Sequence, residues 1–142
     1  KAPYFGEVMP VMEGIINYDE NNLFCYIYNS VSQICSCLNM ETEIIVSSTL
    51  DIDHSLKGQD KVIVICKKTG ATDYYNAIGG QELYNAEDFK KENIDLHFVS
   101  TNPIEYKQFK NEFVPHLSIL DVMMFNSVER VKEMLEDYKL IH

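Results

Sequence analysis

The sequence predicts an α/β fold, in which a mostly parallel three-stranded sheet is flanked by about five helices. Two observations carry this prediction. Short β-branched segments alternate with longer segments in which apolar residues recur at helical spacing. Residues that typically cap helices precede several of the longer segments. Because 142 residues suffice for one domain with its own core, residues 1–142 are expected to form a single α/β domain.

Two helices are predicted in the first part of the chain. Apolar side chains recur at helical spacing in residues 7–18, where Pro10 fits only the first turn. The same pattern is stronger in residues 22–40, and Asn22 or its neighbour Asn21 is the expected N-cap.

Three segments predict the strands of the sheet: residues 43–48, 73–77 and 94–100. In parallel sheets, ligands tend to lie beyond the carboxyl ends of the strands, so the loops that follow these segments are expected to border a site. Gly79 and Gly80 lie in one such loop, where two adjacent glycines allow backbone N–H groups to approach a phosphate or carboxylate. A tight turn is the alternative interpretation of this pair.

Further helices are predicted between and after the strands. Residues 60–68 have the composition of a strand, but two lysines followed by Gly70 favour a helix C-terminus. Residues 86–91 form a short helix after Asn85, and residues 128–138 form an amphipathic helix. Ser127 is the expected N-cap of this last helix.

The composition limits the classes of partner and the compartment. Apolar residues make up 46% of the chain and the net charge is −10, which disfavours binding to nucleic acid or to an anionic membrane. No apolar run is long enough to span a bilayer. The spacing of the four cysteines does not match a metal site. We interpret them as small, buried or half-buried thiols of a protein in a reducing compartment, the cytoplasm: Cys25, Cys35, Cys37 and Cys66.

Residues 113–126 combine an apolar helix with a few polar groups. Pro115 predicts an extended entry, and Ser118 is expected to cap the backbone N–H of Asp121 in the first turn. The apolar residues that follow predict a helix buried nearly all round. The polar groups form either a helix cap or, together with His116, a ligand site at the helix N-terminus.

No metal or cofactor site is predicted. Asp51, Asp53 and His54 could bind a divalent cation, but a solvated loop with local Asp turns is the preferred interpretation. The common phosphate-binding fingerprints are absent, and the cofactor stays unknown. The histidines are scattered along the chain to His142, and His97 in a predicted strand is expected to be packed and hydrogen-bonded.

Several strings in the sequence resemble the WbqC-like protein family. Two long strings carry the resemblance, GATDYYNAIGGQELYNAEDFKKENIDLHF at residues 70–98 and FVPHLSILD at residues 113–121, which is followed by Phe125-Asn126. KAPYF at the start and Ser47-Ser48 resemble the middle of family members. The chain thus resembles the later two-thirds of the family and lacks its opening segment, which implies part of a larger α/β domain. Such a piece would leave a sheet edge exposed and could form a homo-oligomer.

The resemblance implies a bacterial transferase of surface polysaccharide synthesis, including O-antigen and lipopolysaccharide, that moves an aminoacyl group such as glycine to a sugar or nucleotide sugar. This chemistry requires a base and donors for an oxyanion. Asp121 or His116 is the expected base. The expected substrate-binding residues are Gly79, Gly80, Tyr84, Tyr106, Ser118 and Asn126. The alternative is a non-catalytic module that binds a nucleotide or glycan, or that acts as a scaffold in polysaccharide assembly.

Overall fold

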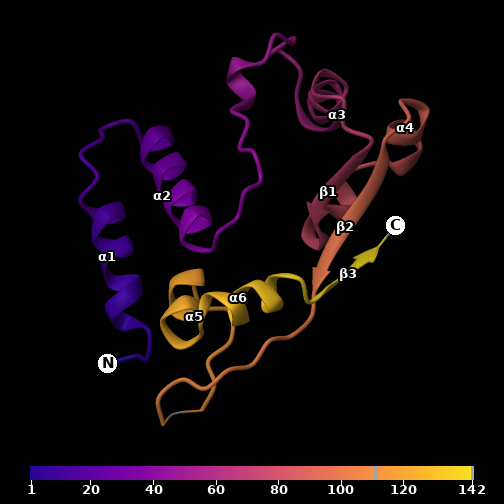
Figure 1. Cartoon of the computed structure of the whole chain (residues 1–142). Helices are drawn as coiled ribbons and strands as arrows, with labels where there is room; N and C mark the ends of the chain where they lie inside the picture. The colour runs from indigo at the N-terminus through magenta and orange to yellow at the C-terminus, as the bar shows by residue number, and fades with distance from the viewer. Residues whose placement is uncertain (111, 142) are drawn as a thin grey trace. The chain divides into compact units, whose positions relative to one another are not determined.

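The computed structural model describes residues 1–110 and 112–141; Asn111 and His142 lie outside them. The chain divides into two compact units (Figure 1). Unit 1 comprises Lys1–Glu43 and Pro103–Asp137, and unit 2 comprises Ile44–Asn102 and Tyr138–His142. The single domain expected for residues 1–142 stays a prediction.

Unit 1 consists of four helices around an apolar core. They are α1 (Phe5–Ile16), α2 (Leu23–Cys37), α5 (Ile119–Phe125) and α6 (Val128–Leu135). The buried core residues are Val8, Leu38, Val122, Met123, Val131 and Met134. All four predicted helices of this part are therefore confirmed, with differences at their ends.

The largest difference at a helix start is in α1. It begins at Phe5 rather than at residue 7, so Pro10 lies inside the helix instead of in its first turn. The backbone N–H of Tyr4 donates to the carbonyl of Met124 (3.1 Å), and the N–H of Val8 donates to the carbonyl of Tyr4. This contact with α5 anchors the chain ahead of Phe5, and a tertiary contact of this kind is invisible to helix periodicity.

Helix α2 has the cap that the sequence predicts. The side-chain oxygen of Asn22 accepts hydrogen bonds from the backbone N–H groups of Phe24 (2.9 Å) and Cys25 (3.3 Å). The helix contains no charged side chain. Five of its apolar residues are nevertheless exposed: Leu23, Phe24, Ile27, Tyr28 and Val31. We refer to these five residues as the α2 apolar face.

Replacing Asn22 with alanine is expected to lower the free energy of unfolding by about 1 kcal/mol, because two N–H groups of the first turn lose their acceptor. Chemical denaturation followed by far-UV circular dichroism measures this change. Asn21→Ala is the matched control, since Asn22 is the residue that caps α2. Equal losses in the two variants would contradict the cap assignment.

Unit 2 is built on a mixed three-stranded sheet. The strands are β1 (Asp73–Ala77), β2 (Asp95–Thr101) and β3 (Tyr138–Ile141), in the order β1-β2-β3. β1 pairs with β2 in parallel, with Tyr75 opposite His97, and β2 pairs with β3 in antiparallel orientation, with Phe98 opposite Ile141. α3 (Gly58–Thr69), α4 (Ala86–Lys91) and the 3₁₀ helices η1 (Ser47–Thr49) and η2 (Ile78–Leu83) complete the unit.

The predicted strand at residues 43–48 is wrong, and the third strand comes from another part of the chain. Residues 43–46 have no regular structure, Ser47–Thr49 forms η1, and Ile44 and Ile45 are exposed. Without a hydrogen-bonded neighbour, β propensity alone does not make a strand. The helix predicted at residues 128–138 ends earlier, since α6 stops at Leu135. The third strand, β3, begins at Tyr138. The sheet is therefore mixed rather than mostly parallel.

The ambiguous segment at residues 60–68 is a helix, as its C-terminal residues predict. Gly70 follows α3 with a left-handed conformation, φ +71°, and its N–H donates to the carbonyl of Lys67. Because residues with a Cβ rarely adopt this conformation, glycine suits the position. β1 and α4 match the predicted bounds, and Asn85 caps α4 by accepting a hydrogen bond from the N–H of Glu87.

The core of unit 2 forms where α3 and α4 meet the sheet, and it comprises Cys66, Phe89, Ile94, Leu96 and Phe98. Phe89 is fully buried. Its ring stacks on that of Tyr74 (centroids 5.6 Å apart) and lies edge-on to that of Tyr84 (5.9 Å). The pKa of Tyr74 is raised to about 12, mainly by burial and to a smaller extent by a hydrogen bond with Tyr84. This aromatic cluster joins α4 to β1 and to the end of η2.

His97 is packed and hydrogen-bonded, as expected for a histidine in a strand. The residue is 8% exposed, and its ring stacks on Tyr75 (centroids 4.7 Å apart). Its Nε2 lies 2.8 Å from Oδ1 of Asp73, to which Thr72 also donates a hydrogen bond. The hydrogen bond from His97, and then that from Thr72, lower the pKa of Asp73 below its ordinary value of 3.8.

The lowered pKa of Asp73 predicts a loss of stability in acid. A carboxylate with a lower pKa in the folded state stabilises that state above its unfolded pKa, and this contribution disappears as the pH falls through the folded pKa. The chain is expected to lose stability below about pH 4, and Asp73→Asn should lose less. Urea midpoints at about pH 7 and about pH 3 measure the difference. An equal acid shift in both proteins would contradict the prediction.

The remaining features concern membrane spans and thiols. Within residues 1–110 and 112–141, no helix has the length and apolar character needed to cross a bilayer. The four cysteines are free thiols, with Cys66 buried and the others half-buried, as expected. Burial raises the pKa of Cys66, which disfavours the reactive thiolate.

Candidate active site

The segment that enters the candidate site alternates between buried and exposed side chains. Ile104, Tyr106 and Gln108 are buried or half-buried, whereas Glu105 and Lys107 between them are exposed. Ile104 and Tyr106 pack against the core of unit 1. An extended backbone points successive side chains to opposite sides, so this segment places Tyr106 and Gln108 toward Asp121 of α5.

Asp121, in the first turn of α5, accepts two hydrogen bonds on one carboxylate oxygen. The hydroxyl of Tyr106 donates to Oδ2 (2.7 Å), and Nε2 of Gln108 donates to the same atom (2.9 Å). Among the described residues, no donor contacts Oδ1. The two bonds fix the orientation of the carboxylate and leave one oxygen available for a ligand.

The ring of Tyr106 lies among other aromatic side chains. It is edge-on to Phe113 (centroids 5.1 Å apart) and tilted against Phe125 (6.3 Å). The pKa of Tyr106 is raised above its ordinary value of 10.0, mainly by burial and to a smaller extent by the hydrogen bond to Asp121. Tyr106 therefore keeps its proton at neutral pH and acts as a hydrogen-bond donor rather than as a base.

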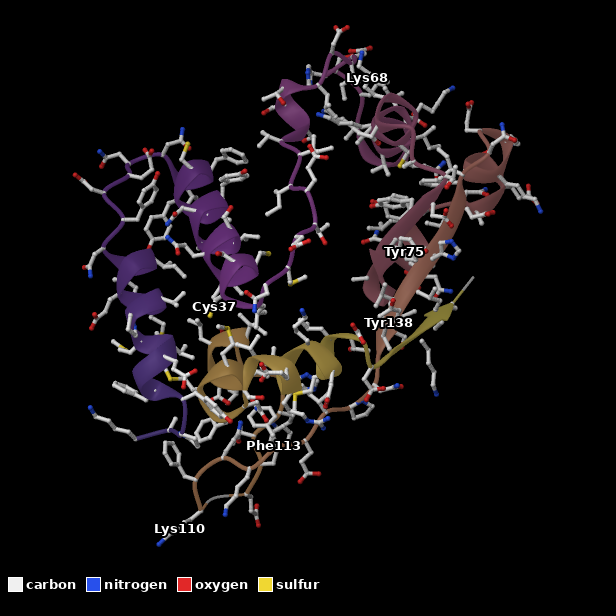
Figure 2. The ribbon with its side chains drawn as sticks, in the orientation of Figure 1. Cys37, Lys68, Tyr75, Lys110, Phe113 and Tyr138 are labelled. Carbon is white, nitrogen blue, oxygen red and sulfur yellow. The ribbon has the colours of Figure 1, made fainter. Side chains whose placement is uncertain are left out.

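An open cleft of about 450 Å³ borders this hydrogen-bonded group. It is lined by Glu105, Tyr106, Lys107, Gln108 and Phe113, and Phe113 lies on the long loop before α5 (Figure 2). A volume of this order is typical of small-molecule sites, which range from roughly 300 to 1,000 Å³. The cleft offers an ammonium and a carboxylate on its rim, an aromatic ring, and the polar groups that hold Asp121.

Ser118 and His116 differ in part from their predicted roles. Ser118 caps α5 as expected, but its side chain accepts from the N–H of Leu120 (3.3 Å) rather than from that of Asp121, which donates to the Ser118 carbonyl. His116 is exposed and has a left-handed backbone, φ +60°. No described residue forms a hydrogen bond or an ion pair with its ring. The structure brings Tyr106 and Asp121 into contact, and it does not join His116 to them.

The helix that carries Asp121 is less buried than predicted. Val122 and Met123 are buried, while the other residues of α5 are half-buried. Asn126 at its end donates from Nδ2 to the carbonyl of Val122 (2.8 Å). It lines a separate cavity of about 30 Å³ together with Leu38 and Val131, which has room for a water molecule or two.

Gly79, Gly80 and Tyr84 belong to unit 2, whereas the other predicted site residues belong to unit 1. Both glycines lie in η2. A Cβ on Gly80 would lie 2.6 Å from Nδ2 of Asn76, while the space around Gly79 is open. Close packing against Asn76 therefore explains why a glycine suits position 80. The ring of Tyr84 packs against Tyr74 and Phe89. A site shared with Asp121 stays a prediction.

The Asp-rich segment at residues 51–54 forms a local turn. Oδ1 of Asp53 accepts hydrogen bonds from the backbone N–H and the hydroxyl of Ser55 (2.9 and 2.7 Å). His54 instead contacts the carbonyl of Leu50 through Nε2 (3.0 Å). Throughout the part of the chain that the structure describes, no group of three or more His, Cys, Asp or Glu side chains is arranged for a metal ion.

Sequence reasoning missed Gln108. It lies in a polar segment for which the sequence predicted neither a helix nor a strand. The available signal was the alternation of Ile104, Tyr106 and Gln108 with charged residues, which indicates a strand-like segment with one buried side.

The fold and the site define an α/β protein with a mixed sheet, in which a carboxylate is held beside an open cleft. The chain belongs to the WbqC-like protein family, whose model matches residues 1–133, nearly the whole chain. Comparison with curated proteins and with solved structures gave no match.

Proposed function

We propose that this WbqC-like chain is a transferase that places an aminoacyl group, glycine in particular, on a sugar or nucleotide sugar in the synthesis of a bacterial surface polysaccharide such as O-antigen. Family membership supports the class of protein. The single observation that carries the chemistry is the Asp121 carboxylate, which Tyr106 and Gln108 hold through Oδ2 while Oδ1 stays available. A cytoplasmic location fits this role, because nucleotide sugars are made there.

In the proposed reaction, a sugar hydroxyl attacks the carbonyl carbon of an activated glycyl ester or thioester. A new C–O bond forms, and the hydroxyl proton passes to Oδ1 of Asp121. The bond to the alcohol or thiol leaving group then breaks, and the leaving group takes the electron pair. Asp121 returns the proton to it. The cleft beside Tyr106 holds the sugar, with Ser118 as a polar group at the start of α5.

The remaining residues that the sequence analysis singled out stay proposals for this reaction. The N–H groups of Gly79 and Gly80 are candidates for stabilising the oxyanion, and Tyr84 and Asn126 are candidates for binding the sugar. Asn126 is the weakest candidate of the four, since its amide nitrogen already donates a hydrogen bond to the Val122 carbonyl.

A direct experiment supplies the protein with the N-acetylcysteamine thioester of ¹³C-labelled glycine and a panel of nucleotide sugars. Mass spectrometry should detect a nucleotide sugar that has gained one labelled glycyl group. The matched control replaces Tyr106 with phenylalanine, which removes the hydroxyl that contacts Asp121 and keeps the aromatic ring. Gain of label at the same rate without protein would contradict the proposal.

The α2 apolar face favours a second candidate, a non-catalytic binding or scaffold module that self-associates. A chain with a net charge of −10 repels its copies, but α2 contributes no charge to that repulsion. A second copy of α2 therefore suits this face. If this candidate is correct, the chain forms a homo-oligomer and has no transferase activity. Light scattering of the wild type and of Ile27→Glu measures the oligomeric state. A monomer at all concentrations would exclude self-association through α2.

A further inference from the structure

Gln108 connects three parts of unit 1 through one buried amide. The residue is 7% exposed. Its oxygen accepts a hydrogen bond from the N–H of Val114 (2.7 Å), and its nitrogen donates to the Val114 carbonyl (3.2 Å). The same nitrogen donates to Oδ2 of Asp121 (2.9 Å) and lies 3.4 Å from the hydroxyl of Tyr106. One side chain therefore joins the cleft wall, the turn before α5, and the carboxylate.

The contacts with Val114 determine which way the amide faces. The Val114 N–H requires an acceptor, so the amide oxygen must lie on that side, and the amide nitrogen is then directed at Asp121. A carboxylate in place of this amide would keep the acceptor and lose the donor. An apolar side chain of similar length would lose both. Only an amide satisfies the backbone and Asp121 together.

We propose that Gln108 is the positioning residue of Asp121: its amide nitrogen holds Oδ2 beside the Tyr106 hydroxyl and thereby keeps Oδ1 available to accept a proton. This inference rests on the proposed transfer reaction for its kinetic consequence. The geometry itself is tested independently of any reaction, because Tyr106 reports on the groups that surround its hydroxyl.

The kinetic test replaces Gln108 with methionine, which has a similar length and cannot make the hydrogen bonds. For transfer of the glycyl group from its thioester, kcat should fall about 10- to 100-fold while KM stays within about twofold. Gln33→Met is the matched control, since Gln33 is an exposed glutamine of the same unit. Rates are normalised to the folded fraction from thermal unfolding. A loss that disappears on normalisation assigns Gln108 a structural role only.

The second test needs no activity. In protein labelled with [¹³Cζ]tyrosine, the Tyr106 signal is assigned with Tyr106→Phe and titrated with alkali. In Gln108→Glu, an anion replaces the donor beside the hydroxyl, so Tyr106 should titrate at a higher pH than in wild type. If Tyr106 shifts in Gln108→Glu while the wild type transfers no glycyl group, the positioning role is retained and the proposed function is overturned. An unchanged Tyr106 titration would overturn the positioning role, whether or not transfer occurs.

Discussion

Asp121→Asn is expected to lower the rate of glycyl transfer by about 10²- to 10⁴-fold, the range that a positioned general base contributes. Asparagine keeps an oxygen that accepts the hydrogen bonds from Tyr106 and Gln108, so the surrounding structure is retained. It cannot take up the proton of the attacking hydroxyl. The transfer assay measures kcat and KM, and thermal unfolding measures the retained fold.

The outcome for Asp121 separates a base from a helix cap. Loss of transfer with an unchanged unfolding midpoint supports the base. If the variant instead unfolds at a much lower temperature, Asp121 stabilises the start of α5, and the assignment fails. His116→Asn distinguishes the second candidate base, because asparagine tolerates the left-handed backbone at this position and lacks the imidazole. Loss of transfer in that variant alone would assign the base to His116.

Phe89→Ala is expected to lower the free energy of unfolding by about 3–5 kcal/mol, the largest effect on stability that we predict. Phe89 is fully buried in unit 2, and its ring contacts those of Tyr74 and Tyr84. The truncation leaves a cavity and removes both ring contacts. Because the chain has no tryptophan, tyrosine fluorescence measures unfolding during urea denaturation.

Phe24→Ala provides the matched control for Phe89. Its side chain is 55% exposed on the α2 apolar face, so its truncation should cost less than about 1 kcal/mol. A comparable loss in the two variants would show that Phe24 is covered in solution. That result would support self-association through α2, and it would be visible as a dependence of the midpoint on protein concentration.

The sequence predicted elements best where a signal is local. Asn22, Asn85 and Ser127 each accept a hydrogen bond from the first turn of the helix that they precede. Gly70 ends α3 with a positive φ. Caps of this kind depend only on residues close in sequence, and that is why helix positions were recovered better than the sheet.

The sheet depended on pairing between distant segments, which local patterns do not reveal. The β-branched residues 43–48 have strand propensity but no partner, whereas β3 pairs with β2 across more than a quarter of the chain. Prediction of the site shows the same difference between local signals and tertiary contacts. Asp121 and Tyr106 were singled out separately, but their contact and the part played by Gln108 depend on tertiary packing. The roles proposed for Gly79, Gly80 and Tyr84 stay predictions.

The division of the chain has a consequence for its synthesis on the ribosome. Each unit is assembled from two stretches of sequence, and in each case the second stretch follows a long interruption by the other unit. β3 follows the second stretch of unit 1 and supplies an outer strand of the sheet. Vectorial translation therefore delivers α1, α2, β1 and β2 well before their final partners. Neither unit can complete its fold until its second stretch has been translated, and β1 and β2 wait for β3 during that delay.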